Sequence, residues 1–149
     1  MNARTIPSPK LVSTIRWLCL MVTIASTAAT SSVGVPTDPS LGTWRNPKNS
    51  VHIRAEHCGG RMCGTVVWAN EKAKADARKG SSDPLVGAQL FRDFVQKKPG
   101  VWQGRVFVPD IGKTFTGSVK VVDENTLEAG GCLLGHFGCK SQIWTRVRS

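Results

Sequence analysis

Four cysteines and two histidines are the residues of this sequence whose types and spacing best suit a chemical role. Each of two cysteine pairs has a histidine beside it or between its members. The six residues are His57, Cys58, Cys63, Cys132, His136 and Cys139. Such a set can ligate zinc through thiolate and imidazole groups, or its cysteines can form two disulfides. The redox state of the compartment helps to separate the two interpretations, because disulfides persist mainly in oxidising environments.

The first 29 residues predict an oxidising compartment, since they have the layout of a secretory signal. Basic residues and no acidic residue precede an apolar stretch from Trp17 to Ile24, and small residues follow it. The stretch is shorter than the roughly 20 residues that span a bilayer, although a retained membrane anchor is the alternative. We expect cleavage after Ala28 or Ala29, a periplasmic or secreted location, and no transmembrane segment in the mature form.

Export also resolves the odd number of cysteines. The fifth cysteine, Cys19, leaves with the signal, so that four remain in the mature chain. An even set of cysteines in an exported domain predicts disulfides rather than a metal site. Three connectivities are possible, and we favour Cys58 with Cys63 and Cys132 with Cys139, because each pair flanks a glycine-containing turn. We predict no metal and no cofactor.

Hydrophobic alternation dominates the sequence after a Pro-rich linker at 30–40, and predicts one β-barrel domain at 41–149. Segments such as "VHIRAE", "CGTVVWA", "VWQGRVFV" and "KTFTGSVKV" alternate apolar and polar residues, as half-buried antiparallel strands do. Counting weaker segments, we expect about eight strands in sequential hairpins, which suits a small closed all-β meander barrel. The exception is 70–86, where Asn70 can begin and Gly80 can terminate one short helix; otherwise the segment is an irregular loop covering a barrel mouth.

Two residues at opposite ends of the predicted domain are expected to meet where the barrel closes. "LGTWRN" contributes Trp44 to the first strand, and "SQIWTRV" contributes Arg146 to the last. A guanidinium stacked on an indole combines cation–π attraction with burial. We predict a structural role for both residues.

These motifs together resemble the bacterial domain-of-unknown-function family 2147. The resemblance rests on the opening Gly-x-Trp, the Cys-Gly before a hydrophobic strand, "DPLVG", the Trp-x-Gly strand that ends in "PDIG", and the closing Trp-Thr-Arg. It covers Leu41 to Val147. It implies an exported, lipocalin-like β-barrel, and it implies neither an activity nor functional residues.

The leading functional hypothesis is a non-enzymatic barrel that binds a small, partly apolar or lipid-like ligand of the cell envelope. Trp102 and Phe115 are predicted to line its interior, although a barrel of this size can also be filled by its own side chains. The predicted mature chain retains 17 basic against 10 acidic residues. A second hypothesis is therefore a cationic module that recognises an anionic envelope polymer or protein, without a role for nucleic acid.

A metal-dependent enzyme is the third and least favoured hypothesis. His52 lies on the predicted solvent face of a strand, and His57 and His136 lie near glycine-rich turns. No motif of a nucleophile elbow, a phosphate loop or a zinc protease is present. We therefore predict no catalytic residues.

Overall fold

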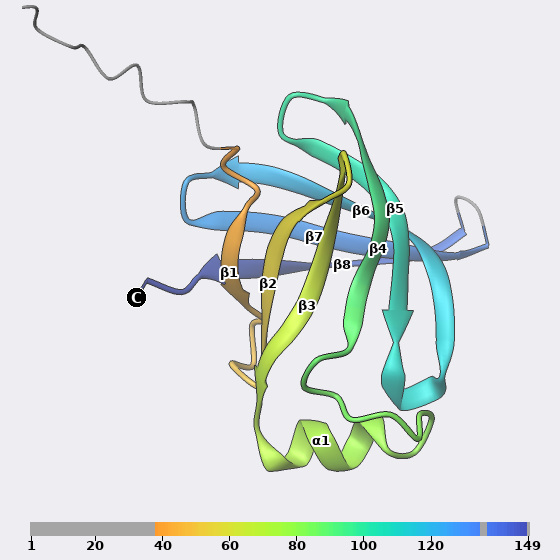
Figure 1. Cartoon of the computed structure of the whole chain (residues 1–149). Coiled ribbons are helices and arrows are strands. Elements are labelled where there is room, and N and C mark those ends of the chain that lie inside the picture. Colours follow the sequence, from red (N-terminus) through yellow and green to blue (C-terminus); the bar gives the residue numbers. More distant parts are fainter. Residues whose placement is uncertain (1–37, 135–136, 149) are drawn as a thin grey trace, which may run out of the picture. The chain divides into compact units, whose positions relative to one another are not determined.

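The chain folds into a closed antiparallel barrel of eight strands in sequential order (Figure 1). The structure is a computed structural model, and it describes residues 38–134 and 137–148. Each strand pairs with the next and β1 pairs with β8. The strands are β1 (Gly42–Arg45), β2 (Val51–Cys58), β3 (Arg61–Ala69), β4 (Gln89–Lys98), β5 (Val101–Val108), β6 (Lys113–Asp123), β7 (Thr126–Leu134) and β8 (Phe137–Arg146). The predicted all-β meander barrel is confirmed. The predicted signal segment and most of the predicted linker lie outside the described residues.

The alternation read from the sequence sets which side chains face the barrel interior. On β2, Ile53 and Ala55 are buried while Arg54 and Glu56 are exposed, because successive side chains of a strand point to opposite faces. Strand β2 pairs with β3, with Ala55 opposite Gly64. The aliphatic face of β2 is therefore the core face, as predicted.

Strand β4 departs from simple alternation through a β-bulge. Phe91 and Phe94 are both buried although they lie three positions apart, and the pairing with β5 shifts between Arg92 and Val95. Asp93 takes a positive φ of 55° at this point. An extra residue in one strand lets two side chains separated by three positions face the same side. The bulge thus adds a second aromatic ring to the core.

A short helix and a single turn of 3-10 helix lie together at one end of the barrel. Helix α1 (Glu71–Ala77) begins at Asn70, whose side-chain oxygen accepts a hydrogen bond from the Ala73 amide at 2.8 Å. The turn η1 (Pro109–Ile111) ends at Gly112, which has a φ of 63°. Figure 1 shows α1 below the strands, on the side where β3 ends and β4 begins. The short helix predicted from the sequence is therefore present.

Gly80 has a different role from the one expected of it. The helix ends at Ala77, and its C-cap is Arg78 in a right-handed conformation. A Cβ on Gly80 would lie 2.6 Å from the Pro109 carbonyl oxygen and 2.5 Å from the Gly112 nitrogen. Gly80 does not terminate the helix. It permits the loop after α1 to pack backbone against backbone on the β5–β6 connection.

The barrel closes at the seam between β1 and β8. The Arg146 guanidinium carbon lies 4.0 Å from the centre of the Trp44 ring, and the indole N–H donates to the Ser40 carbonyl at 3.0 Å. The guanidinium also donates to the carbonyls of Leu41 at 2.8 Å and Pro39 at 2.6 Å. Arg146 therefore ties the end of the chain to the turn that precedes β1.

The same contacts explain the glycine of the Gly-x-Trp motif. Gly42 has a φ of 121°, and a Cβ there would collide with the Arg146 guanidinium. A residue with a side chain fits neither the backbone conformation nor the space. Ser40 is fully buried, so the ordered contacts of the barrel begin before the predicted boundary at Leu41.

One half of the barrel interior is filled by large side chains. Met62, Trp102 and Leu127 are each the second residue of a strand that follows a hairpin turn, and all three are at most 3% exposed. Phe94 and Val119 pack in the same core and are fully buried. This filled half leaves the half toward α1 as the place for a cavity.

Candidate functional site

The cysteines form two local disulfides, Cys58 with Cys63 and Cys132 with Cys139. The second joins directly paired residues of β7 and β8. Among the described residues, the atoms of Glu56, Cys58 and Cys63 lie within 4.8 Å of one another, which is a spacing that a metal ion could use. Both sulfurs are in a covalent bond, however, so neither is a thiolate that could ligate zinc. The connectivity is the one that the sequence favoured.

The two histidines in the described chain do not complete a metal site. The centre of the His57 ring lies 6.1 Å from that of Trp102, and the centre of the His52 ring lies 4.5 Å from that of Trp68. His52 Nε2 lies 2.7 Å from Asn49 Oδ1. Partial burial, and then the nearby Arg45 charge, lower the pKa of His52. His136 lies outside the described residues.

A cavity of about 610 Å³ opens at the α1 end of the barrel. Its inner wall is apolar and includes Val51, Leu90, Phe91, Val106 and Trp144. These side chains come from β2, β4, β5 and β8, and α1 contributes Ala73 and Ala77. Ligand sites in proteins are commonly concave and largely apolar, with volumes of about 300 to 1,000 Å³. The cavity therefore has the size and lining of a small-molecule site.

A smaller chamber of about 300 Å³ shares one wall with this cavity. The shared wall consists of Phe91, Val106, Val108, Gln142 and Trp144. The chamber extends to β6 and β7 through further residues, which include Phe115, Ala129, Gly131 and Cys132. The two spaces are thus neighbouring parts of the same hollow half.

Glycines along β7 and β8 help to keep the chamber open. Gly130, Gly131 and Gly138 line it, and Gly131 has ordinary room for a Cβ, with Thr116 O as its nearest neighbour at 3.4 Å. A larger side chain at Gly131 would occupy space that is now free. The hollow is therefore a consequence of small residues on these two strands.

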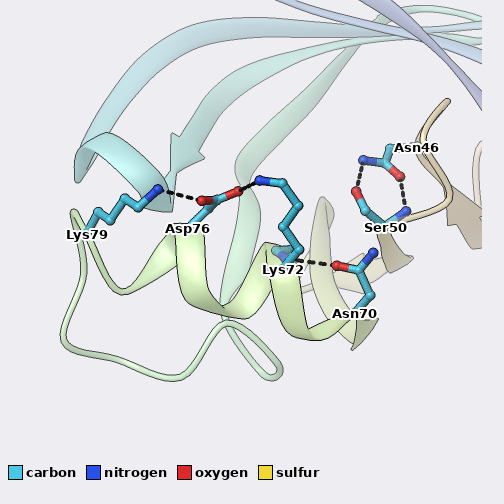
Figure 2. A network of polar contacts seen from close by, with 7 residues as sticks. Asn46, Ser50, Asn70, Lys72, Asp76 and Lys79 are labelled. Carbon is cyan, nitrogen blue, oxygen red and sulfur yellow. Dashed lines mark hydrogen bonds and ion pairs between the residues drawn. The ribbon is translucent and has the colours of Figure 1, made fainter.

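A polar network borders the larger cavity at α1. Figure 2 shows the Asp76 carboxylate between the Lys72 and Lys79 ammonium groups, both at 2.6 Å. These two hydrogen-bonded lysines lower the pKa of Asp76 to about 2. On the β1–β2 connection, the Asn46 side chain exchanges hydrogen bonds with Ser50. The border is thus polar and of mixed charge, while the interior is apolar.

A third hollow, of about 590 Å³, lies outside the barrel along the β1–β8 seam. Its lining includes Arg45, His52, Arg146 and Arg148 and no acidic residue. Arg146 is already engaged with Trp44 and three backbone carbonyls. The groove is therefore cationic, with Arg45 and Arg148 as its more accessible charges.

The comparisons with known proteins agree with this geometry. A family model described as an uncharacterised protein conserved in bacteria, DUF2147, matches residues 42–146. The chain belongs to this family. None of the curated proteins compared with it matches.

The DUF2147 barrel is also similar to a solved structure. That protein is HP1028 from the human pathogen Helicobacter pylori, which is described as a member of the lipocalin family. The TM-score is 0.62 and the identity 16%, over 73% of this chain and 83% of the other. Identity this low shows the fold alone, and the lipocalin-like fold predicted from the sequence is confirmed.

The structure separates the two residues that the sequence analysis proposed as ligand-lining. In the DUF2147 barrel, Phe115 lines the smaller chamber. Trp102 is 3% exposed and lines neither cavity, and its indole N–H has no hydrogen-bond partner in the described part of the chain. Trp102 belongs to the filled half.

Sequence reasoning missed Phe91, Val106 and Trp144, which line both cavities. It also missed Lys140 and Gln142, which lie on the same face of β8 as Trp144. A period-two signal for the last group was visible in "CKSQIWTRV", because alternate residues share a face. That signal identifies the face. It does not show which depth of the barrel is hollow.

Proposed function

We propose that this DUF2147 protein is an exported, non-enzymatic barrel that binds a small, partly apolar ligand in its hollow half. The observation that carries the proposal is the asymmetry of the interior. Large side chains fill the half near the hairpin turns, whereas a cavity of about 610 Å³ with an apolar inner wall and a polar border lies near α1. Empty apolar space sacrifices packing contacts, and a preformed cavity of this kind provides burial for a ligand.

Export is supported by the disulfides and by the signal-like segment. Disulfides persist in oxidising compartments, and two are present in the domain. In the described part of the chain, no helix is long and apolar enough to cross a membrane. The disulfides and the signal-like segment fit a periplasmic or secreted protein.

One of the two acidic groups at the cavity is poorly suited to catalysis. Asp76 and Asp110 are the carboxylates that line it. A general base works best with a pKa near the operating pH, whereas two lysines hold the pKa of Asp76 at about 2. Asp76 is therefore an ion-pair partner and a poor base.

The test is to fill the hollow half and measure binding of a neutral apolar probe, N-phenylnaphthylamine, by fluorescence. Val108 lines both spaces, so Val108→Trp should weaken probe affinity by about tenfold or more. The matched control is Val122→Trp, because Val122 is 52% exposed on β6. The affinity of this control for the probe should stay within about twofold of that of the wild type.

Circular dichroism establishes whether both variants are folded. If Val108→Trp does not fold, Ala129→Leu is the second variant, because it fills the same chamber. Wild-type protein that does not bind the probe, or folded filled variants that bind it as well as the control does, contradicts the proposal. Native mass spectrometry of protein recovered from its cell envelope then identifies the carried molecule. An adduct lost on organic extraction is the expected result.

The cationic groove at the seam favours a second candidate function, recognition of an anionic envelope polymer or protein. Arg45 and Arg148 line it without an acidic neighbour in the groove. Binding there should weaken steeply with added salt, because salt screens exposed charges. Binding by apolar burial should persist, so a salt titration distinguishes the two functions.

A further inference from the structure

The smaller chamber combines an apolar wall with one unneutralised positive charge. Among the residues that line it, Lys140 and Gln142 have long polar side chains, and none of the lining residues is acidic. The apolar part of the wall comes from residues that include Val106, Phe115 and Trp144. No ion pair of Lys140 occurs among the described residues. The chamber therefore has an apolar region and a cationic region.

Strand β8 is the element that creates this combination. Gly138, Lys140, Gln142 and Trp144 are alternate residues that all line the chamber, as the two-residue period of a strand requires. Trp144 is 7% exposed, whereas Lys140 and Gln142 are exposed. Along one face of β8, the lining thus changes from a buried indole to a solvated ammonium group.

This gradient matches the two parts of an amphiphile. An apolar tail gains from burial beside Val106 and Trp144, whereas an anionic head is costly to desolvate and is best placed at the solvent edge beside a cation. We propose that the ligand is a singly anionic amphiphile, with its head group on Lys140 and Gln142 and its tail in the hollow half. The inference rests on the proposed function and specifies the chemistry of its ligand.

The charges at the α1 opening of the larger cavity favour Lys140 as the site of the anionic head group. Lys48 and Lys72 line the larger cavity together with Asp76 and Asp110. The Lys72 ammonium is already bound to Asp76 at 2.6 Å, and the two carboxylates of this lining balance its two lysines in formal charge. Lys48 is therefore the fitting control: it lines the same hollow half, at the border where acidic residues are present.

The experiment measures displacement of N-phenylnaphthylamine by dodecanoate, dodecanol and dodecyltrimethylammonium, which have tails of equal length. Charge-assisted hydrogen bonds are roughly twice as strong as neutral ones, so wild-type protein should bind dodecanoate about tenfold more tightly than dodecanol. Lys140→Met keeps most of the apolar stem and removes the charge. It should lower the affinity for dodecanoate to that for dodecanol and so abolish the preference.

The control Lys48→Met should retain the preference for dodecanoate, and Lys140→Arg should also retain it. Equal affinities of the wild type for dodecanoate and dodecanol overturn the inference and leave the proposed function standing. Loss of the preference in Lys48→Met rather than in Lys140→Met also overturns it, because the head would then lie at the α1 opening. A protein that binds neither the probe nor any of the three amphiphiles overturns both proposals.

Discussion

At the scale of single residues, Arg146 has the most demanding combination of contacts in the described chain. Its guanidinium lies over the Trp44 ring and donates to three backbone carbonyls, those of Pro39, Leu41 and Glu124. A planar guanidinium can stack and donate in several directions at once, which an ammonium group cannot. The Gly-x-Trp and closing Trp-Thr-Arg motifs are therefore two halves of one contact, separated by nearly the whole domain.

Arg146→Met should lower the free energy of unfolding by about 3 kcal/mol, because it removes the stack and leaves three carbonyls without their donor. Arg146→Lys should recover only part of this loss. The matched control is Arg148→Met, since Arg148 makes one exposed hydrogen bond to Asn125, and we expect a change within about 0.5 kcal/mol. Denaturant unfolding measures all three variants, and equal effects of the Arg146 and Arg148 substitutions would refute the structural role.

At the scale of elements, the bulge in β4 determines how the barrel is filled. Asp93 takes its positive φ beside Arg61 and Arg105, with which it forms ion pairs. The bulge brings Phe91 and Phe94 to the same face, with ring centres 5.3 Å apart. Phe94 enters the filled core and Phe91 lines both cavities. The boundary between the filled and hollow halves therefore passes through this strand.

Gly104 faces the bulge and should not tolerate a side chain. A Cβ there would lie 2.5 Å from the Phe94 ring and 2.8 Å from the Arg92 carbonyl oxygen, so Gly104→Ala forces the ring or the backbone to move. We expect a loss of about 2 to 3 kcal/mol in the free energy of unfolding. Gly131→Ala is the control, because its nearest neighbour would be at 3.4 Å. Thermal unfolding of both variants should separate them, and similar melting temperatures would show that the bulge is not tightly packed.

At the scale of the whole molecule, the barrel joins a filled half to a hollow half and carries two local crosslinks. The Cys132–Cys139 bridge holds β7 to β8 directly beside the chamber, since Cys132 itself lines it. The Cys58–Cys63 bridge joins β2 to β3, and Cys63 is 3% exposed. One bridge is thus placed at the proposed binding space and the other is not.

Replacing each pair by serines should separate stability from binding. Both bridges close short loops, so each double variant should lose roughly 2 kcal/mol of unfolding free energy. Only the Cys132→Ser/Cys139→Ser variant should also weaken binding of N-phenylnaphthylamine, because its bridge lies in the chamber wall. Unfolding curves and probe titrations on the two double variants test this, and equal probe affinities would show that the bridge does not shape the chamber.

Much of the fold follows from local signals. The alternation in "VHIRAE" identified the core face of β2, and Asn70 predicted the start of α1. Each of these depends on residues within a few positions of one another, so the sequence contains the necessary information. The even set of cysteines after the signal likewise predicted two disulfides, and the glycine-containing turns favoured the local pairing among the three possible connectivities.

Only the tertiary structure decided which inward-facing residues border empty space. Trp102 and Trp144 both face inward, yet Trp102 is packed in the filled half and Trp144 lines both cavities. Alternation determines the face of a side chain, whereas its depth depends on the register of all eight strands and on the Asp93 bulge. Gly80 and Lys140 show the same limit, because their roles depend on the β5–β6 connection and on chamber walls distant in sequence. By itself the sequence determined the barrel and its closing contact, and the packing of distant strands determined where that barrel is hollow.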